Sequence, residues 1–414
     1  MRRNYVPALA AFLLMAGLVL LPGCQSSRQA GDLRSHLTTV LIPSVPGSGE
    51  PNLAVINTKT ILLSWIGPVD STANRLNFMK YDGQDWSALQ TVASGKNWFV
   101  NWADFPSLAS PDGKLMAANW LVKSKASPYA YDVFLALSRD GGKQWSRPFK
   151  PHRDNTATEH GFVSIIPEDS SHFRVAWLDG RNFAKKQGEE NLNVMTLRSA
   201  RVAADGTVGD TVLLDERVCD CCQTSAAKTE NGIFLAYRNR TAQEVRDINY
   251  VILKNGRWSP PKTLYADGWE IHGCPVNGPA VAAAGKKIAV AWFTAAHNQP
   301  RVKISFSANE GGQFSEPLIV DDGHPLGRVD AVLLEDGSAV VSWMESAGDS
   351  AYLKVRKISS AGTPNAARIV AEMDPSRASG FPKMVYAAGK LYIVWREIHP
   401  KAHIRLAVLN PRLL

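Results

Sequence analysis

Four of the five cysteines lie in two short segments, VCDCCQTS at residues 218–225 and IHGCPVNGP at residues 271–279. Their sulfur atoms belong to Cys219, Cys221, Cys222 and Cys274. Thiols placed this close together form disulfides in an oxidising compartment, or they bind a soft metal ion as thiolates. We expect a disulfide between the CDCC triplet and Cys274, which leaves two cysteines too close in sequence to pair without strain. The alternative is a copper or zinc site in which His272 or His160 joins the cysteines.

Seven short apolar segments, each ending in an aromatic residue, divide the chain into repeats. Their spacings are 55, 57, 60, 55, 51 and 52 residues, and their last residues are Trp65, Trp120, Trp177, Tyr237, Trp292, Trp343 and Trp395. A period of this size indicates an array of one supersecondary unit. We expect these aromatic side chains to pack between neighbouring units as part of the core. Both cysteine segments fall in connections between units.

Each repeat contains the pattern of four antiparallel strands. An apolar segment is followed by a glycine turn, the aromatic-ended strand, a loop, an alternating strand, a second turn and a fourth strand; Asn231-Gly232 and Asp336-Gly337 are typical hairpin turns. This unit is the blade of a β-propeller, so the sequence predicts an all-β propeller of seven four-stranded blades. The last repeat lacks a fourth strand. We expect residues 37–43, LTTVLIP, to supply it and close the ring.

Two of the turns between third and fourth strands carry a signature. Residues 138–145, SRDGGKQW, match the pattern S-x-D-x-G-x-x-W, and residues 307–314, SANEGGQF, are a near copy. This pattern resembles the Asp box of the sialidase superfamily, also called the BNR repeat. Its role is structural, because the Asp or Asn side chain caps its own turn and the glycines accept positive φ. Sialidase catalytic domains have six blades, which makes a six-bladed ring the alternative to seven.

The repeat also predicts which residues share a face of the ring. If the first strand of each blade lines the axis, the Asp boxes lie on one face, and the loops between second and third strands and between blades lie on the other. We expect that second face to form a polar funnel at the axis, where binding residues usually gather. The candidate ligand-binding residues are Asp154, His160, Arg238, Asp247, Asn277 and Arg396.

The resemblance implies an enzyme that acts on an acidic glycan. Sialidase-like hydrolases hold a carboxylate with an arginine cluster and use a Tyr–Glu pair and an Asp. The candidate catalytic residues on the second face are Asp104, Glu159, Asp179, Arg181, Arg246, Arg328 and Asp330, and Arg396 is a fourth candidate for the arginine clamp. The Arg-Ile-Pro motif and a tyrosine nucleophile are missing, so hydrolysis of sialic acid is not favoured and catalysis itself is left open.

A second hypothesis needs no hydrolysis. The CDCC segment and the nearby histidines would then bind a metal ion, a thiol compound or a partner protein. The two hypotheses differ in the consequence of substituting Cys222 and Cys274, which abolishes function in the second and mainly lowers stability in the first.

The N-terminus has the features of a targeting segment. Two arginines precede an apolar run that ends in Leu21-Pro22-Gly23-Cys24, which resembles a bacterial lipobox. We expect residues 1–23 to be a signal peptide, Cys24 to be acylated, residues 24–35 to be a tether and residues 36–414 to form the propeller. Because Gln25 is not the aspartate associated with retention at the inner membrane, the predicted location is the outer membrane, facing the periplasm or the cell surface.

The formal net charge of +8 over 414 residues is mild and is not concentrated in a Lys/Arg stripe. It supports a preference for anionic substrates or lipid headgroups, and it argues against nucleic acid as a partner. We expect a monomer attached to outer-membrane lipid through Cys24.

Overall fold

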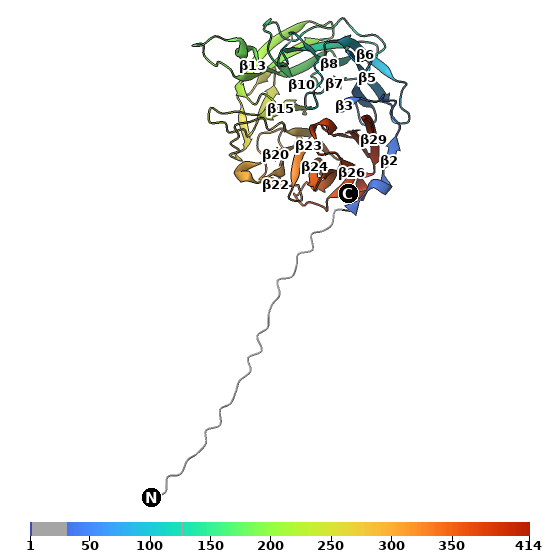
Figure 1. Ribbon diagram of the computed structural model, residues 1–414, viewed down its shortest axis with the longest axis vertical. Coiled ribbons are helices and arrows are strands. Elements are labelled where there is room, and N and C mark those ends of the chain that lie inside the picture. Colours follow the sequence, from blue (N-terminus) through green and yellow to red (C-terminus); the bar gives the residue numbers. More distant parts are fainter. Residues whose placement is uncertain (2–30, 126) are drawn as a thin grey trace.

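The computed structural model describes Met1, residues 31–125 and residues 127–414. The predicted signal peptide and Cys24 therefore lie outside the described residues. Within them, the strands form seven β-sheets that follow one another around a central axis (Figure 1). The predicted seven-bladed β-propeller is confirmed, and the six-bladed alternative is wrong for this chain.

Each blade is an antiparallel sheet of consecutive strands, with the first strand nearest the axis. Blades one to three consist of β3 to β6 (Gly49–Val55, Ile61–Pro68, Ala73–Tyr81, Gln90–Lys96), β7 to β9 (Ser107–Ala109, Met116–Lys123, Tyr131–Ser138) and β10 to β13 (His160–Pro167, His172–Asp179, Met195–Ala203, Val208–Val218). Blades four and five consist of β14 to β18 (Ser225–Lys228, Gly232–Arg238, Ile248–Lys254, Arg257–Trp258, Lys262–Tyr265) and β19 to β22 (Ala280–Ala284, Lys287–Thr294, Arg301–Ser307, Leu318–Ile319). Blades six and seven contain β23 to β26 (Pro325–Leu333, Ala339–Ala347, Ser350–Ile358, Arg368–Met373) and β27 to β29 (Lys383–Ala387, Lys390–Glu397, His403–Leu409).

Two features depart from four regular strands per blade. The fourth position of the second blade is reduced to a bridge in which Phe149 and Leu135 exchange both backbone hydrogen bonds, at 2.8 and 2.9 Å. In the fourth blade, β17 and β18 both pair with β16. Short 3-10 turns occur at Arg34–His36, Arg181–Ala184, Ala296–Asn298, Arg377–Ser379 and Pro411–Leu413.

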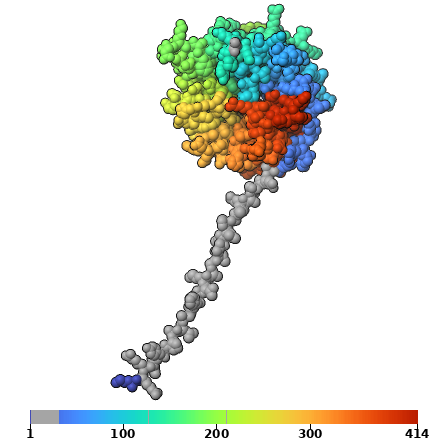
Figure 2. Space-filling view, viewed as in Figure 1, coloured from blue at the N-terminus to red at the C-terminus, as the bar shows by residue number. Residues whose placement is uncertain are grey.

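The N-terminal segment closes the ring as predicted. Strand β2 (Thr38–Val40) pairs antiparallel with β29 and becomes the outer strand of the seventh blade. Figure 2 shows the result, with the blue N-terminal part of the propeller beside the red C-terminal part. Packing starts before β2, because β1 (Gly31–Asp32) pairs in parallel with β26 of the sixth blade and Leu33 is buried in that core. The outer edges of the sixth and seventh blades are thereby covered by strands from the N-terminal segment.

The seven aromatic residues of the repeat are all buried, as predicted. Each packs in a cluster shared by its own blade and the preceding one; Trp65, for example, lies with Val385 and Ala387 of the seventh blade. Several of the indole N–H groups donate to a carboxylate, as in the 2.8 Å bond from Trp177 to Asp179. This bond removes the cost of burying an unpaired donor in the interblade core.

The axis is a channel of about 490 Å³ lined by the first strands of all seven blades. At the face opposite the Asp boxes, the connection between the first two blades crosses the axis and reaches the connection between the last two. Trp102 stacks on Phe381 with ring centroids 5.6 Å apart, and Phe105 approaches the same ring at 6.0 Å. Aromatic side chains therefore gather at this end of the channel, where the sequence predicted a polar funnel.

Candidate functional site

The two Asp boxes adopt the same hydrogen-bonded turn. Asp140 accepts from the Ser138 hydroxyl at 2.8 Å and from the backbone N–H of Gln144 at 2.9 Å. Asn309 accepts the equivalent bonds in the second box at 2.9 Å each. Gly141 takes a φ of 76°, which explains the glycine at this point of the motif. These side chains are engaged in their own turns, so the structural role predicted for the Asp boxes is confirmed.

A polar pocket of about 570 Å³ lies on the other face, away from the axis. Its walls come from the loop between β8 and β9, the connections that follow the second, third and fourth blades, and the loop between β15 and β16. The residues are Tyr129, Glu159, Asp220, Cys221, Arg240, Glu244, Arg246, His272, Gly273 and Cys274. Three interblade connections thus meet two hairpin loops at this site.

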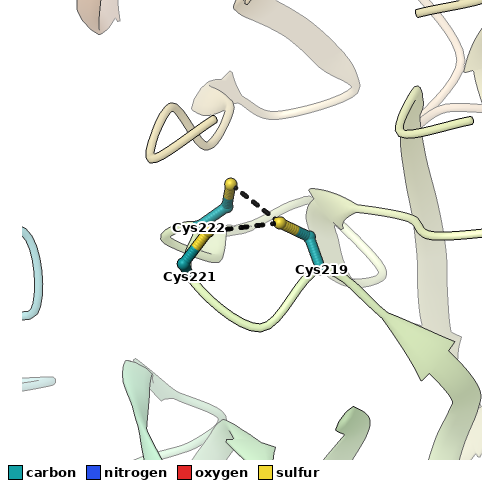
Figure 3. Close-up of side chains that lie close together, drawn as sticks. All are labelled: Cys219, Cys221 and Cys222. Atoms are coloured by element: carbon teal, nitrogen blue, oxygen red, sulfur yellow. Dashed lines mark hydrogen bonds between the residues drawn. The ribbon is translucent and has the colours of Figure 1, made fainter. Parts of the chain in front are cut away.

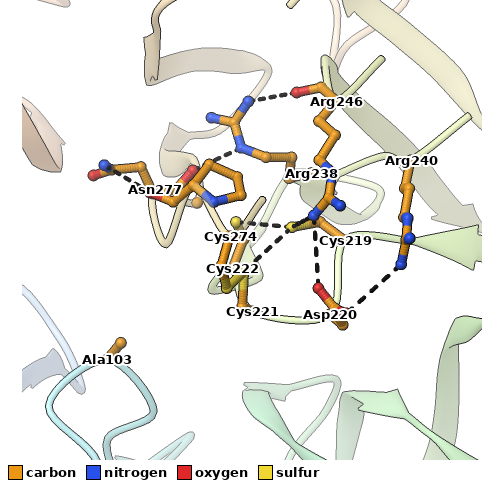
Figure 4. Close-up of a disulfide and its surroundings, with 12 residues drawn as sticks. Ala103, Cys219, Asp220, Cys221, Cys222, Arg238, Arg240, Arg246, Cys274 and Asn277 are labelled. Atoms are coloured by element: carbon orange, nitrogen blue, oxygen red, sulfur yellow. Dashed lines mark hydrogen bonds and ion pairs between the residues drawn. A yellow bond between two sulfur atoms is a disulfide. The ribbon is translucent and has the colours of Figure 1, made fainter. Parts of the chain in front are cut away.

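The disulfide predicted between the CDCC triplet and Cys274 is present, and its partner is Cys221 (Figure 4). It joins the connection before the fourth blade to the connection after it and forms one wall of the pocket. Cys219 and Cys222 remain free and buried. The Cys219 sulfur lies 3.1 Å from that of Cys222 and 3.7 Å from that of Cys221 (Figure 3).

The arrangement of these residues does not assemble the four-cysteine metal site of the alternative prediction. The disulfide consumes two of the sulfurs, and a disulfide sulfur is not a thiolate ligand. The side chain of His272 is 75% exposed and its imidazole pairs with Glu270 at 3.2 Å. Among the described residues, Cys219 and Cys222 are left as the two thiols of this cluster.

The two free thiols differ in acidity. Burial opposes ionisation of Cys219, but the hydrogen bond from Cys222, a backbone N–H and the Arg246 guanidinium outweigh it and lower the pKa of Cys219 to about 7. Burial and the neighbouring Cys219 raise the pKa of Cys222 well above its usual value. Arg246 donates to the Cys219 sulfur at 3.4 Å. Cys219 is therefore the more acidic thiol of the pair.

The floor of the pocket is a network of alternating charges. Glu244 accepts from Arg240 at 2.8 Å and from Arg246 at 2.7 Å, and Asp220 lies 3.6 Å from each arginine. The hydrogen bond from Arg240 is the largest cause that lowers the pKa of Glu244 to about 2; burial opposes it, and the hydrogen bond from Arg246 adds to the lowering. Glu244 is thus ionised throughout the neutral range.

Glu159 has the opposite environment. Burial raises its pKa to about 7, and the nearby negative charge of Asp220 adds to the effect. The pocket consequently holds one carboxyl group that keeps its proton close to neutral pH and one that has lost it.

A second ionisable cluster lies beside Glu159, between the second and third blades. His152 and His160 stack with ring centroids 4.0 Å apart and planes at 1°. Asp154 lies 3.1 Å from one ring and 3.2 Å from the other, and Asp132 lies 3.7 Å from both. Imidazole lone pairs lie in the ring plane, so two parallel rings do not direct them at a common metal position.

The two imidazoles respond differently to that environment. Burial opposes a charge on His160, but Asp154 and Asp179 raise its pKa, whereas burial lowers the pKa of His152. Asp154, also a predicted ligand-binding residue, has its pKa lowered by both histidines despite burial. The Asp154 carboxylate is therefore engaged in hydrogen bonds with the two histidines.

The predicted arginine clamp does not form. Arg181 pairs with Asp179 at 2.6 Å, and Arg396 lies near Glu50 and the carbonyl of Ala378. Arg328 donates to Ser379 and to backbone carbonyls around Pro375, and burial lowers its pKa to about 10. The guanidinium groups are used to satisfy neighbouring loops, and Arg246 alone among the four lines the pocket.

Several other predicted residues hold the loops in place. Arg238 donates to three backbone carbonyls, including that of Asn277 at 2.8 Å, and the Asn277 side chain accepts from the N–H of Arg328 at 2.7 Å. Asp247 accepts from the N–H groups of residues 268 and 269 at 3.0 Å each. These contacts are interblade or loop contacts, and none of the three residues lines the pocket.

The remaining two predicted acids are also structural. Asp104 accepts from the N–H of Phe162 at 2.8 Å, and burial raises its pKa to about 8. Asp330 accepts from the N–H of Met384 at 2.7 Å in the axial channel, and burial raises its pKa as well. Each links the connections or inner strands of different blades.

Sequence reasoning missed five residues of the pocket, namely Tyr129, Asp220, Arg240, Glu244 and Gly273. Arg240 and Glu244 stand four residues apart in the same loop as Arg246. A charge pair at that spacing beside the CDCC segment was the available signal. Tyr129 follows a second strand and carries no motif.

No helix among the described residues has the length and apolarity to cross a membrane. No family model matches the chain. No curated protein matches it either.

Solved structures resemble the chain over most of its length. A protein of unknown function from Dyadobacter fermentans shares 12% identity with a TM-score of 0.51, covering 90% of this chain and 97% of its own. The GH93 α-L-arabinofuranosidase of Fusarium graminearum shares 14% identity with a TM-score of 0.48, covering 91% and 98%. A Hadza microbial sialidase shares 12% identity with a TM-score of 0.45, covering 86% and 77%. At such identities the likeness concerns the fold alone.

Proposed function

We propose that the protein binds and cleaves an acidic glycan in the 570 Å³ pocket, with Glu159 as general acid and Glu244 as its ionised partner. The observation that supports this proposal is the separation of the two pKa values, about 7 for Glu159 and about 2 for Glu244. Carboxyl groups whose environments drive their pKa values apart in one pocket divide acid and base roles between them. Most glycoside hydrolases use such a pair across the scissile bond.

The walls of the pocket suit an anionic sugar. The Arg240 guanidinium is partly exposed in the pocket and can donate to a substrate carboxylate, while the buried Arg246 adds positive charge behind it. Tyr129, 67% exposed at the rim, offers an aromatic face for a sugar ring. Protonation of Glu159 below its pKa removes a negative charge that would repel the substrate. The mild positive charge of the whole chain acts in the same direction.

The chemistry favours an acidic sugar other than sialic acid. Tyr237, the tyrosine nearest the loop of Arg240, is buried and donates to Asp215 at 2.6 Å, so it is not available as a nucleophile. Tyr129 is exposed and has no base among its described hydrogen-bond partners. A carboxyl pair acting on a uronate-type residue requires neither tyrosine.

We further propose that this pocket works at the outer membrane. The support is the lipobox-like sequence that ends at Cys24, which lies outside the described residues. Packing of β1 onto the sixth blade places the start of the described chain at the outer edge of the propeller. Globomycin treatment followed by fractionation of the membranes tests this placement, since accumulation of an uncleaved precursor supports it and an unaffected soluble product contradicts it.

A glycan panel tests the function. Uronate- and sialate-containing oligosaccharides are compared with neutral counterparts for binding by calorimetry and for release of new reducing ends. Acidic members should bind, Arg240→Gln should weaken them at least tenfold, and Glu159→Gln should abolish cleavage while binding is kept. Arg139→Gln, on the Asp-box face, is the matched charge control. Binding of no acidic glycan, or equal binding by the Arg240 and Arg139 variants, would overturn the proposal.

A further inference from the structure

The four described cysteines form two pairs that stand side by side, one bonded and one reduced. The bonded pair is Cys221–Cys274, and the reduced pair is Cys219 and Cys222. The Cys219 sulfur touches both pairs, at 3.1 Å from Cys222 and 3.7 Å from Cys221 (Figure 3). Both distances are within reach of a sulfur that attacks a neighbouring sulfur after a small rotation of its side chain.

The pairs differ in their access to solvent. Cys219 and Cys222 are 1% and 2% exposed, so an external reagent cannot reach them directly. Cys274 is exposed and Cys221 is half-buried on the wall of the pocket. An external thiol or disulfide therefore meets the outer pair first.

Cys219 has the surroundings of an attacking thiolate. Arg246 donates to its sulfur at 3.4 Å and lies 3.6 Å from Asp220 (Figure 4). Glu244 also holds that guanidinium in place. Although burial opposes it, the hydrogen bond from Cys222 and the charge of Arg246 lower the pKa of Cys219 to about 7. A thiol whose pKa lies near the ambient pH combines a large thiolate fraction with retained nucleophilicity.

We propose that the four cysteines form a thiol–disulfide relay, in which the buried Cys219/Cys222 dithiol exchanges with the Cys221–Cys274 disulfide and the outer pair exchanges with an external disulfide or dithiol. The argument for the relay does not rest on the proposed glycan chemistry, although both sites share Arg246. It explains why the CDCC segment contains more cysteines than a single structural bond requires.

The internal steps balance without another reagent. The Cys219 thiolate attacks the Cys221 sulfur, a 219–221 bond forms, and Cys274 leaves as a thiolate. The Cys222 thiol then loses its proton and attacks the Cys219 sulfur, which forms a 219–222 bond and releases Cys221 as a thiolate. The two protons lost by Cys219 and Cys222 are taken up by Cys221 and Cys274.

The outer dithiol then reduces an external disulfide. The Cys274 thiolate attacks it and forms a mixed disulfide with release of one external thiolate. The Cys221 thiolate attacks Cys274, restores the 221–274 bond and releases the second external thiolate. Overall, the buried dithiol is oxidised and one external disulfide becomes two thiols; a dithiol drives the same steps in reverse.

Disulfide mapping tests the relay in the full chain. The protein is equilibrated in buffers of reduced and oxidised glutathione, trapped by acid and alkylation, and digested with trypsin. Cleavage after Arg217 and Lys228 releases one peptide with three cysteines, and cleavage after Lys262 and Lys286 releases Cys274 in another. The structure's pairing gives a cross-linked product with two alkyl groups, whereas the exchanged pairing gives an internally bonded 219–222 peptide and an alkylated Cys274 peptide.

Both pairings should appear, and the rate of their exchange should rise about tenfold between pH 6 and pH 8, as the thiolate fraction of a group with a pKa near 7 does. Cys219→Ser should eliminate the exchanged pairing, and Cys222→Ser should trap a 219–221 bond. Circular dichroism shows whether each variant is folded. If a variant is unfolded, the disulfide map of the wild-type protein alone tests the relay. A wild-type map that keeps only the 221–274 bond at every redox ratio, or a bound soft metal that blocks alkylation of Cys219, overturns the relay.

Discussion

Replacing Glu159 with glutamine isolates the carboxyl group on which the proposed chemistry depends. The substitution keeps the size of the side chain and removes its ionisation. Glu159 is largely buried in the pocket wall beside Asp220, and its pKa is raised to about 7 from an ordinary 4.5. A difference of this size implies that ionising Glu159 costs the folded protein free energy which the unfolded chain does not lose.

The magnitude follows from the two pKa values. At about 1.4 kcal/mol for each pH unit, the interval from 4.5 to about 7 corresponds to about 3 kcal/mol. Because the folded state binds the proton more tightly, the contribution of Glu159 is fully present below pH 4.5 and is lost as the pH rises through 7. Relative to the wild type, Glu159→Gln should therefore gain about 3 kcal/mol of unfolding free energy between pH 4.5 and pH 7.5.

Urea unfolding followed by tryptophan fluorescence measures this difference, since the chain contains twelve tryptophans. Titrating groups that do not interact with Glu159 are common to both proteins and cancel in the comparison, whereas Asp220 and His160 lie close enough to respond to the substitution. Asp112→Asn, an exposed turn carboxylate, is the matched control and should show no comparable trend. If the free-energy difference between Glu159→Gln and the wild type is flat from pH 4.5 to 7.5, Glu159 ionises normally and cannot be a protonated acid at neutral pH.

Three further predictions concern the scaffold. Deleting residues 36–44 removes β2 from the seventh blade and should give an insoluble or strongly destabilised protein; a deletion that melts like the parent would contradict the closure. Cys274→Ala removes a cross-link that spans 53 residues and should lower the unfolding free energy, measured by urea titration, by about 4 kcal/mol. A loss of less than about 1 kcal/mol would show that the bond does not constrain the unfolded chain. Asp140→Ala removes two hydrogen bonds of an exposed turn and should cost about 1 kcal/mol by thermal melting, with glycan binding unchanged because the Asp boxes lie on the other face.

The architecture could be predicted because its signals are local and repeated. An aromatic residue at the end of a second strand occupies the same interblade position in every unit. Trp177 and Trp343 therefore both pack between their own blade and the preceding one. Turn chemistry is local as well, which is why the hydrogen bonds of Asp140 follow from its motif. The exceptions depend on contacts between distant segments, such as the stacking of Trp102 on Phe381 across the axis.

The site could be predicted only in part for the same reason. The repeat placed the cysteines and Glu159 on the correct face, and the spacing rule selected the partner segment of the disulfide. The repeat pattern could not show whether an arginine side chain faces solvent or donates to a backbone carbonyl. Arg238 and Arg328 are consumed by carbonyls of neighbouring blades, whereas Arg240 is held beside Arg246 by Glu244. The partners of a buried guanidinium are set by loop packing, which no single motif encodes.

Arg246 makes the two proposed activities interdependent, because the same guanidinium faces the pocket and the Cys219 sulfur. A thiolate at Cys219 places a negative charge behind the arginine and should weaken an acidic ligand. For charges about 8 Å apart near a protein surface, the effect is on the order of 1–2 kcal/mol, or about five- to thirty-fold in affinity. Cys219→Ser, which carries no charge, should therefore bind an acidic glycan more tightly than the wild type at pH 8. At pH 6, where the Cys219 thiol is mostly protonated, the two proteins should bind alike. Equal affinities at pH 8 would separate the pocket from the cysteines, whereas a gap that opens as the pH rises through 7 would show that the charge on Cys219 reaches the ligand through Arg246.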